Sequence, residues 1–211
     1  MNIKVCGITS MKQLQQLDGL DVDFAGLIFY KQSPRYVADR ISKQELSDAD
    51  LDIKTVGVFV NAEYDEIMET VEAFGLDVVQ LHGDESPHLC EQISNEIETI
   101  KSFRIVDKSE KSIDYMLKEY DEVCDYYLFD SAGANGHGNG GTGIKFDWQK
   151  IAVSKIEKPF FLSGGISPED AQLVKKFKHP DFYGVDLNSL FEKEPGVKDM
   201  ALVLQFVHGL K

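Results

Sequence analysis

Short strand-like runs alternate with helical patterns along all 211 residues, and this alternation predicts a single (β/α)₈ TIM barrel of the α/β class. Most of these runs are continuously apolar, which is typical of parallel strands that are covered on both faces. Eight strand–helix units without a linker make a barrel of minimal length, with residues 1–211 as one domain. A doubly wound open sheet is the alternative topology.

The expected strands are short and evenly spaced. In chain order they are 3–6, 24–29, 55–60, 76–81, 98–103, 126–130, 160–163 and 182–186. Polar residues that can cap a helix follow several of them. These caps are Ser10 with Gln13 as a capping box, Asn61, Ser86 before Pro87, and Ser167 before Pro168. Residues 200–210 form the last amphipathic helix, and residues 40–50 have the weakest helical pattern.

The charge balance and the cysteine count narrow the class of protein. The net charge is −14, from 36 acidic and 22 basic residues, with no basic run, so we expect no nucleic-acid or membrane partner. Three widely spaced cysteines, Cys6, Cys90 and Cys124, indicate a reducing compartment rather than disulfides. The sequence shows neither a secretory signal nor a long apolar span, so a cytoplasmic protein is expected.

A barrel places its active site at the carboxyl ends of the strands, which directs attention to the residues there. Gly164 and Gly165 end the seventh strand just before the helix cap Ser167. Glycines allow an anion to approach the backbone, and free N–H groups at a helix start bind it, so a phosphate site is expected. Asn188 and Ser189 after the eighth strand can add N–H groups. A tight turn that needs glycine is the alternative.

A glycine-rich run at 133–148 follows the sixth strand. Gly136, Gly138 and Gly141 formally match the dinucleotide fingerprint, but the loop is too long for the tight strand-to-helix turn that this motif requires. We interpret the loop at 131–143 as a lid over the barrel mouth, with Gly141 as a substrate contact. Flexible filler remains the alternative.

Two further residues at strand ends are candidates for ligand contact. Arg35 follows the second strand in a loop stiffened by Pro34, and its guanidinium can bind a carboxylate or a phosphate; an ordinary surface arginine is the alternative. His82 ends the fourth strand and either orients a loop or contacts the ligand. The histidines lack paired metal-ligand spacing, so no metal is expected.

Cys6 and Asp130 end the first and sixth strands, so a barrel directs both toward one opening. A thiolate base and a carboxylic acid beside a small substrate make a general acid–base pair. A buried cysteine can equally be a small core residue, and an aspartate can cap a helix or fix a loop. Position alone leaves both interpretations open.

The chain also carries, in order, the motifs "KVCGIT", "GLIFYKQSPRYV", "VGVFVN", "VQLHGDE", "GGTGIKFDW", "LSGGISPED" and "EPGVKD". In these motifs it resembles the phosphoribosylanthranilate isomerases. The resemblance implies a cofactor-free barrel that takes part in tryptophan biosynthesis, at the third step from chorismate. It implies the Amadori rearrangement of N-(5-phosphoribosyl)anthranilate to 1-(2-carboxyphenylamino)-1-deoxyribulose 5-phosphate.

The resemblance also implies roles for individual residues. They are Cys6 as general base, Asp130 as general acid, Arg35 as the ligand of the anthranilate carboxylate, and Gly164, Gly165, Asn188 and Ser189 as the phosphate site. Leu190 stands where the family commonly has glycine, which bears on the local backbone. Another ribotide-phosphate isomerase, with aspartates at both catalytic positions and two phosphate sites, and a non-catalytic phosphate-binding barrel are the alternatives. A barrel of this kind can be a monomer or a homodimer.

Overall fold

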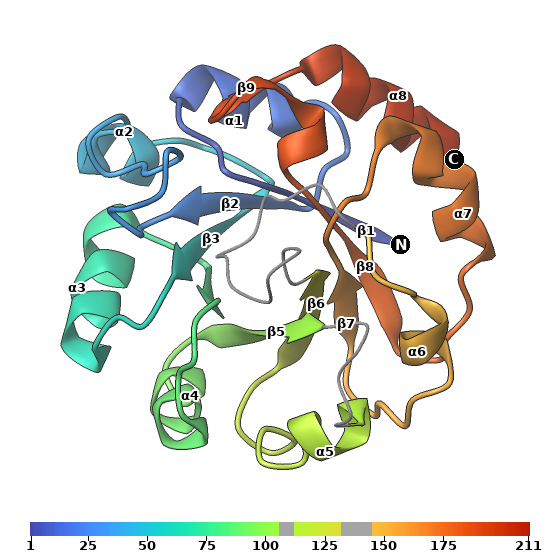
Figure 1. Ribbon diagram of the computed structural model, residues 1–211. Helices are drawn as coiled ribbons and strands as arrows, with labels where there is room; N and C mark the ends of the chain where they lie inside the picture. Colours follow the sequence, from blue (N-terminus) through green and yellow to red (C-terminus); the bar gives the residue numbers. More distant parts are fainter. Residues whose placement is uncertain (106–111, 132–144) are drawn as a thin grey trace.

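Parallel strands form a closed barrel in chain order, β1 to β8, in the computed structural model (Figure 1). The structure describes residues 1–105, 112–131 and 145–211. The strands are β1 (Asn2–Cys6), β2 (Phe24–Ile28), β3 (Lys54–Phe59), β4 (Val78–Leu81), β5 (Glu98–Ile105), β6 (Tyr126–Ser131), β7 (Phe160–Leu162) and β8 (Phe182–Leu187). Because β1 pairs with both β2 and β8, the sheet is closed, which confirms the barrel and excludes the open sheet.

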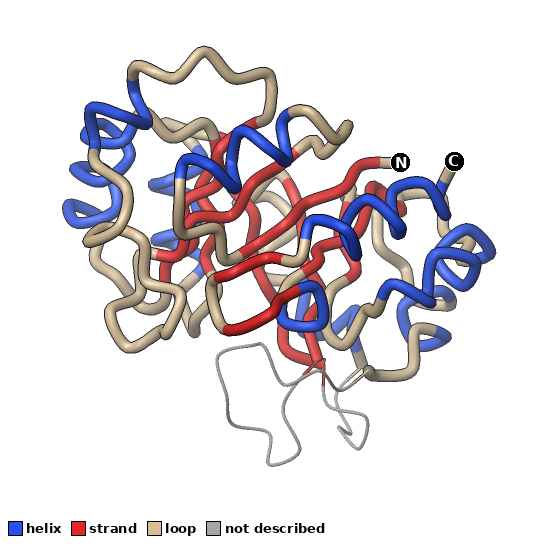
Figure 2. Tube along the Cα trace, turned by 90° about the horizontal axis from the view of Figure 1, so that it is seen from above, coloured by secondary structure: helices blue, strands red, loops and turns tan. Residues whose placement is uncertain are grey.

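Helices surround the strands of the barrel (Figure 1), and Figure 2 shows the same arrangement turned by 90°. They are α1 (Met11–Asp18), α2 (Lys43–Ser47), α3 (Tyr64–Phe74), α4 (Pro87–Ser94), α5 (Ile113–Leu117), α6 (Gln149–Ala152), α7 (Ala171–Lys176) and α8 (Met200–Leu210). The β8–α8 connection has its own structure. It contains the 3₁₀ turn η2 (Ser189–Phe191) and an antiparallel hairpin of β9 (Glu192–Glu194) and β10 (Val197–Lys198). The sequence pattern did not predict this hairpin.

The helix caps agree only in part with the expectations. Ser10 accepts a hydrogen bond from the backbone N–H of Gln13, and Ser86 caps α4 ahead of Pro87. The expected cap at Asn61 is wrong, because α3 begins after Glu63. Asn61 has a φ of 51°, and its side-chain oxygen accepts a hydrogen bond from the Asp84 N–H in the next loop. This side chain therefore ties two loops together.

Two further helical segments, α2 and the turn before α7, begin with a capping box. In the segment expected to be the weakest helix, Ser42 and Glu45 form a capping box on the short α2. Ser167 makes a similar box with Asp170, but the first turn there is the 3₁₀ turn η1 (Pro168–Asp170), and α7 follows it. Short helices of this kind rely on packing against the barrel more than on their own propensity.

The inside of the barrel has an apolar floor and a polar upper part. The floor is a cluster of side chains that are at most 4% exposed: Phe24, Val56, Val78, Ile100, Leu128 and Phe161. Tyr126 and Tyr183 pack against it. Nearer the carboxyl ends of the strands, buried polar side chains such as Lys4, Gln80 and Asp186 replace the apolar ones. The barrel therefore closes at one end and becomes polar toward the other.

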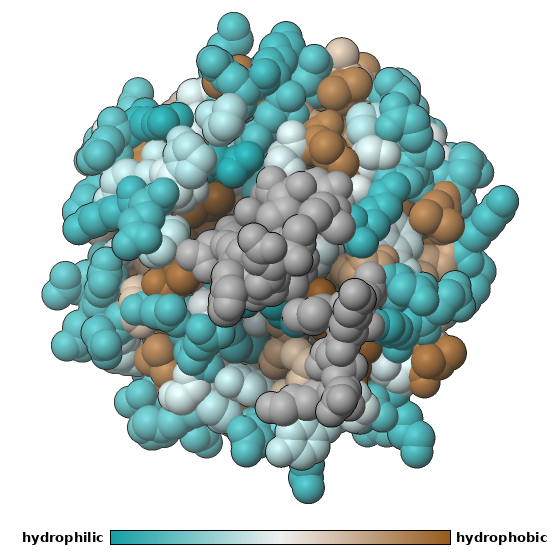
Figure 3. Space-filling model, in the orientation of Figure 1, coloured by the Kyte–Doolittle hydropathy of each residue, from teal (hydrophilic) through white to brown (hydrophobic). Residues whose placement is uncertain are grey.

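The outer surface is mostly hydrophilic in the orientation of Figure 3, with separate brown patches between the teal residues. Among the exposed large apolar side chains, Val153 follows α6 and Leu173 lies in α7. Isolated exposed apolar residues are normal on a protein surface. No helix in the described ranges is long and apolar enough to cross a membrane.

Candidate active site

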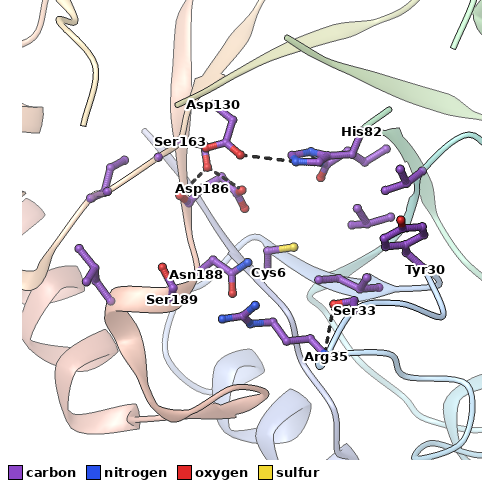
Figure 4. A pocket seen from close by; sticks show the side chains of 18 residues that line it. Cys6, Tyr30, Ser33, Arg35, His82, Asp130, Ser163, Asp186, Asn188 and Ser189 are labelled. Atoms are coloured by element: carbon purple, nitrogen blue, oxygen red, sulfur yellow. Dashed lines mark hydrogen bonds and ion pairs between the residues drawn. The ribbon is translucent and has the colours of Figure 1, made fainter. Parts of the chain in front are cut away.

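A pocket of about 710 Å³, including its solvent-open part, lies at the carboxyl ends of the barrel strands (Figure 4). Its lining includes almost all of the predicted site residues. They are Cys6, Arg35, His82, Asp130, Gly164, Gly165, Asn188 and Ser189. Gly141 and the glycine-rich lid lie outside the described residues. The predicted roles of these residues stay predictions, but the fold brings the residues themselves together.

Cys6 is the last residue of β1, and its thiol lies in the pocket. Gly26 on β2 is its neighbour across the parallel pair. A Cβ atom at Gly26 would lie 2.7 Å from the Cys6 sulfur, well inside ordinary contact distance. The glycine therefore leaves the space that the thiol occupies.

Lys4 and Asp186 form an ion pair in the wall beneath Cys6. The Lys4 Nζ lies 2.7 Å from Asp186 Oδ1, and Lys4 is fully buried. Ser163 donates a hydrogen bond of 3.0 Å to the other carboxylate oxygen of Asp186. Because side chains two residues apart on a strand share a face, Lys4 and Cys6 both point inward. The thiol therefore lies next to a buried positive charge that is itself compensated.

The charges around Cys6 act on its pKa in opposite directions. Burial raises the pKa of the thiol above its ordinary value, and the positive charge of Lys4 is the largest effect that lowers it. Asp186 adds to the rise, whereas Lys198 and Arg35 oppose it. The net shift is upward, so the thiol is the main form at neutral pH in the free protein.

Asp130 lies near the end of β6 and is paired with His82 (Figure 4). The His82 Nε2 lies 3.4 Å from Asp130 Oδ2, and both side chains are mostly buried. The amide nitrogen of Gln80 donates to His82 Nδ1 at 2.9 Å, and the Ser102 hydroxyl lies 3.0 Å from the same atom. Gln80 and Ser102 thus hold the ring from its Nδ1 side, which leaves Nε2 facing Asp130. His82 thus orients the carboxyl group as well as lining the pocket.

Arg35 reaches the pocket from the loop after β2, and its guanidinium is already paired with a carboxylate. Its Nε and Nη2 donate to the carboxylate of Glu192 on β9, the latter at 2.6 Å. Gly7, with a φ of 80°, lets the arginine stem pack on the backbone, because a Cβ there would lie 2.6 Å from Arg35 Cδ. The β8–α8 hairpin therefore holds the arginine that was expected to bind a carboxylate.

The two glycines after β7 have the backbone that a phosphate site requires. Gly164 and Gly165 have φ values of 80° and 65°, a region that residues with a side chain rarely adopt. A Cβ at Gly164 would also lie 2.5 Å from the backbone nitrogen of Ser131. Within the described residues, the N–H groups of Gly164, Gly165 and Ser189 donate no hydrogen bond. These groups are available to an anion in the pocket.

Leu190 fits its turn without strain. Among the described residues, Asp21 and Asn61 are the only ones other than glycine with a positive φ. Leu190 sits in the 3₁₀ turn η2 and lines the pocket. A glycine is therefore not needed at this position in this chain.

In the described part of the chain, no three His, Cys, Asp or Glu side chains gather into a candidate metal site.

Sequence reasoning assigned no role to four charged residues in or behind the pocket lining: Lys4, Asp186, Glu192 and Lys198. Lys4 had a visible signal, because a lysine inside a continuously apolar strand needs a buried partner. Glu192 and Lys198 had none, since their hairpin places them by tertiary contact.

The whole chain is similar to known proteins of one kind. Residues 3–209 match the family model described as N-(5'phosphoribosyl)anthranilate (PRA) isomerase. An N-(5'-phosphoribosyl)anthranilate isomerase of Parabacteroides distasonis is 41% identical over 212 residues, covering 100% of this chain and 93% of the relative. The crystal structure of monomers made from the dimeric phosphoribosylanthranilate isomerase of Thermotoga maritima has a TM-score of 0.83 and 27% identity, covering 100% of this chain and 98% of that one.

A second solved structure shows a relative with a ligand. It is a phosphoribosyl anthranilate isomerase in complex with reduced 1-(o-carboxyphenylamino)-1-deoxyribulose 5-phosphate, with a TM-score of 0.81 and 27% identity, covering 100% of this chain and 98% of that one. The match to the family model spans nearly the whole chain, and the relatives share its full length. The chain therefore belongs to the N-(5'-phosphoribosyl)anthranilate isomerase family and is an isomerase.

Proposed function

We propose that this protein converts N-(5-phosphoribosyl)anthranilate into 1-(2-carboxyphenylamino)-1-deoxyribulose 5-phosphate, the Amadori rearrangement of tryptophan biosynthesis. The observation that carries the proposal is the placement of a thiol, Cys6, and a carboxyl group, Asp130, in one pocket. The pocket also has an arginine at one side and, at another, two glycines whose N–H groups donate no hydrogen bond within the described residues. A substrate with a carboxylate, a sugar and a phosphate matches these three parts.

Asp130 acts as the general acid in the first step. Its carboxyl proton passes to the ring oxygen of the ribose, the bond from this oxygen to C1′ breaks, and the anilino nitrogen lone pair forms a protonated Schiff base. Asp130 is buried and its Oδ1 accepts a hydrogen bond from the Ser131 N–H at 2.8 Å, so the carboxyl group is held in place. His82 lies at its Oδ2 and orients that oxygen.

Cys6 acts as the general base in the second step. Its thiolate removes the proton from C2′, and the electron pair of that bond neutralises the iminium and gives an enolamine. Transfer of the enol proton away from O2′ and protonation of C1′ then give the ketone, so the reaction neither gains nor loses atoms. The thiolate is the minor form at neutral pH, and Lys4 stabilises it when it forms.

The two anionic ends of the substrate are bound by different donors, one by a side chain and the other by the backbone. The carboxylate lies on Arg35, and the phosphate on the N–H groups of Gly164, Gly165, Asn188 and Ser189. The whole chain carries a net charge of −14, which opposes an anionic substrate at long range. Local donors must therefore outweigh this field, and salt, which screens the long-range term, should favour binding.

The decisive experiment is turnover of phosphoribosylanthranilate by the purified protein and by Cys6→Ala and Asp130→Ala. Loss of a positioned base or acid should lower kcat by at least about 10²-fold. Matched controls are Cys90→Ala, a buried cysteine on α4, and Asp125→Ala, an aspartate at the other end of the barrel. Near-normal turnover by either site variant would remove that residue from its role.

The wild-type protein itself tests the alternatives. If it rearranges only an aminoimidazole ribotide, the other ribotide isomerase is correct, and if it binds phosphate without turnover, the non-catalytic barrel is correct. The proposed chemistry consists of proton transfers, so a chelator should leave the rate unchanged.

We further propose a single-domain cytoplasmic enzyme that needs no cofactor and pairs as a homodimer, as the Thermotoga maritima relative does.

A further inference from the structure

Glu192 is a buried carboxylate behind the pocket with several hydrogen-bond partners. It accepts hydrogen bonds from Arg35 Nε at 2.8 Å, Arg35 Nη2 at 2.6 Å, Lys198 Nζ at 2.8 Å and the Gly196 N–H at 3.1 Å. The side chain is 4% exposed, and it does not line the pocket itself. Its partners outweigh the effect of burial and lower the pKa of Glu192, so the carboxylate is charged at neutral pH. A buried charge so fully paired fixes the position of its partners.

The ion pair with Glu192 determines which N–H donors of Arg35 remain for a ligand. A guanidinium has a side-on edge, formed by Nε and one Nη, and an end-on edge, formed by the two Nη groups. Glu192 occupies the side-on edge through Nε and Nη2. The end-on edge has no hydrogen bond within the described residues, and Arg35 lines the pocket. A carboxylate in the pocket can therefore meet two parallel N–H groups without displacing Glu192.

Lys198 adds charge and connects the same carboxylate to the phosphate end. Its ammonium group is fully buried and donates to the Asn188 carbonyl oxygen at 3.2 Å and to the Asn188 Oδ1 at 2.8 Å, besides Glu192. Arg35 and Lys198 therefore share one carboxylate beside the pocket. Burial lowers the pKa of Lys198 below its ordinary value, and Glu192 opposes this effect.

We propose that Glu192 is a positioning residue for substrate selection, which fixes Arg35 with its end-on edge toward the pocket and so selects an aromatic amine that carries a carboxylate. This inference rests on the proposed function and assigns the recognition of the carboxylate to a pair rather than to Arg35 alone. Glu192 does not touch the substrate. Its effect is on the orientation of the guanidinium.

The test uses two stable ligands, the reduced product analogue and the same compound without its carboxyl group. Dissociation constants are measured by calorimetry for the wild type, Glu192→Ala, Glu192→Gln and Arg35→Lys. The wild type should prefer the carboxylated ligand by at least about tenfold, the lower end for a hydrogen-bonded ion pair. Glu192→Ala should lose most of this preference while its affinity for the ligand without the carboxyl group stays within about twofold.

Several results would overturn the inference. Equal weakening of both ligands would mean that Glu192 only stabilises the fold, and tighter binding of the carboxylated ligand would mean that Glu192 competes with it. A wild type without any preference would refute the role of Arg35 in the proposed function, which separates that failure from a failure of Glu192. If Glu192 acts through Arg35, adding Glu192→Gln to Arg35→Lys should change the preference by less than about twofold.

Two further variants test whether a loss of stability alone could explain the result. Glu192→Gln keeps the volume of the side chain and serves if the alanine variant does not fold. Asp77→Asn removes a carboxylate that accepts two hydrogen bonds from Thr55 before β4, at the other end of the barrel. It should lower the thermal unfolding temperature and leave the ligand preference unchanged. A loss of preference in Asp77→Asn would show that destabilisation alone produces the effect and would overturn the inference.

Discussion

If Cys6 is the base of the proposed reaction, replacing Gly26 by alanine should slow this reaction by moving the thiol. The new Cβ would lie 2.7 Å from the Cys6 sulfur and 2.9 Å from its Cα, whereas ordinary contact begins at 3.4 Å. The sulfur must therefore move by about 0.7 Å, and a misplacement of about 1 Å can cost about 10²-fold in rate. We expect kcat for phosphoribosylanthranilate to fall by about 10- to 100-fold.

Gly57→Ala is the matched control, because the same methyl group there meets side chains outside the barrel. Its Cβ would lie 2.6 Å from Leu76 Cδ1 and 2.9 Å from Phe59 Cε2. Both variants should lose about 1–3 kcal/mol in the free energy of unfolding, measured by urea denaturation, as overpacked cores do. Only Gly26→Ala should lose activity beyond its loss of folded protein. If folded Gly26→Ala turns over within about twofold of Gly57→Ala, the position of the thiol does not limit the rate and the reasoning is wrong.

Three further perturbations test other parts of the site. Arg35→Ala should raise KM by at least about tenfold with a smaller change in kcat, because it removes binding that is present before the reaction, and an unchanged KM would exclude Arg35 from the site. The pKa of Cys6 is raised, so its thiolate fraction is small at pH 7 and kcat/KM should rise as the pH increases above 7, whereas a flat profile would contradict a thiolate base. Lys4→Met should move this rise to higher pH, and it should lower the free energy of unfolding by about 3–5 kcal/mol because it leaves Asp186 buried without its cation. Gly164→Ala places a Cβ 2.5 Å from a backbone nitrogen at a φ of 80°, so it should weaken inorganic phosphate binding in titration calorimetry and lower the free energy of unfolding by about 1–2 kcal/mol or more; unchanged phosphate affinity would place the anion elsewhere.

The predictable part of this site follows from the strands. Cys6 and Asp130 each end an apolar run, and a parallel barrel brings such ends together whatever the detailed packing. The glycines after β7 were predictable for a similar reason, since a strand that turns directly into a helical turn needs an unusual backbone. Local pattern and topology were sufficient for these residues.

The contacts between loops were not predictable in the same way. Arg35 and Glu192 are 157 positions apart, and Lys4 and Asp186 are 182 apart. Nothing local to either residue names its partner, because each pair depends on which loops the closed sheet brings side by side. Asn61 shows the opposite error, since its residue type suits a helix cap but its side chain binds the neighbouring loop instead. Polar residues at strand ends therefore need the fold before their partners can be assigned.

The apolar floor of the barrel has a consequence for proton traffic. Because its aromatic and aliphatic side chains are at most 4% exposed and carry no titrating group, they separate the site from solvent at the amino ends of the strands. In the proposed reaction, the thiol holds the proton taken from C2′ after one turnover, and the carboxylate lacks the one it gave to the ring oxygen. Both must be reset through the mouth or through the bound product. Exchange with solvent should then depend on how long the ligand occupies the mouth.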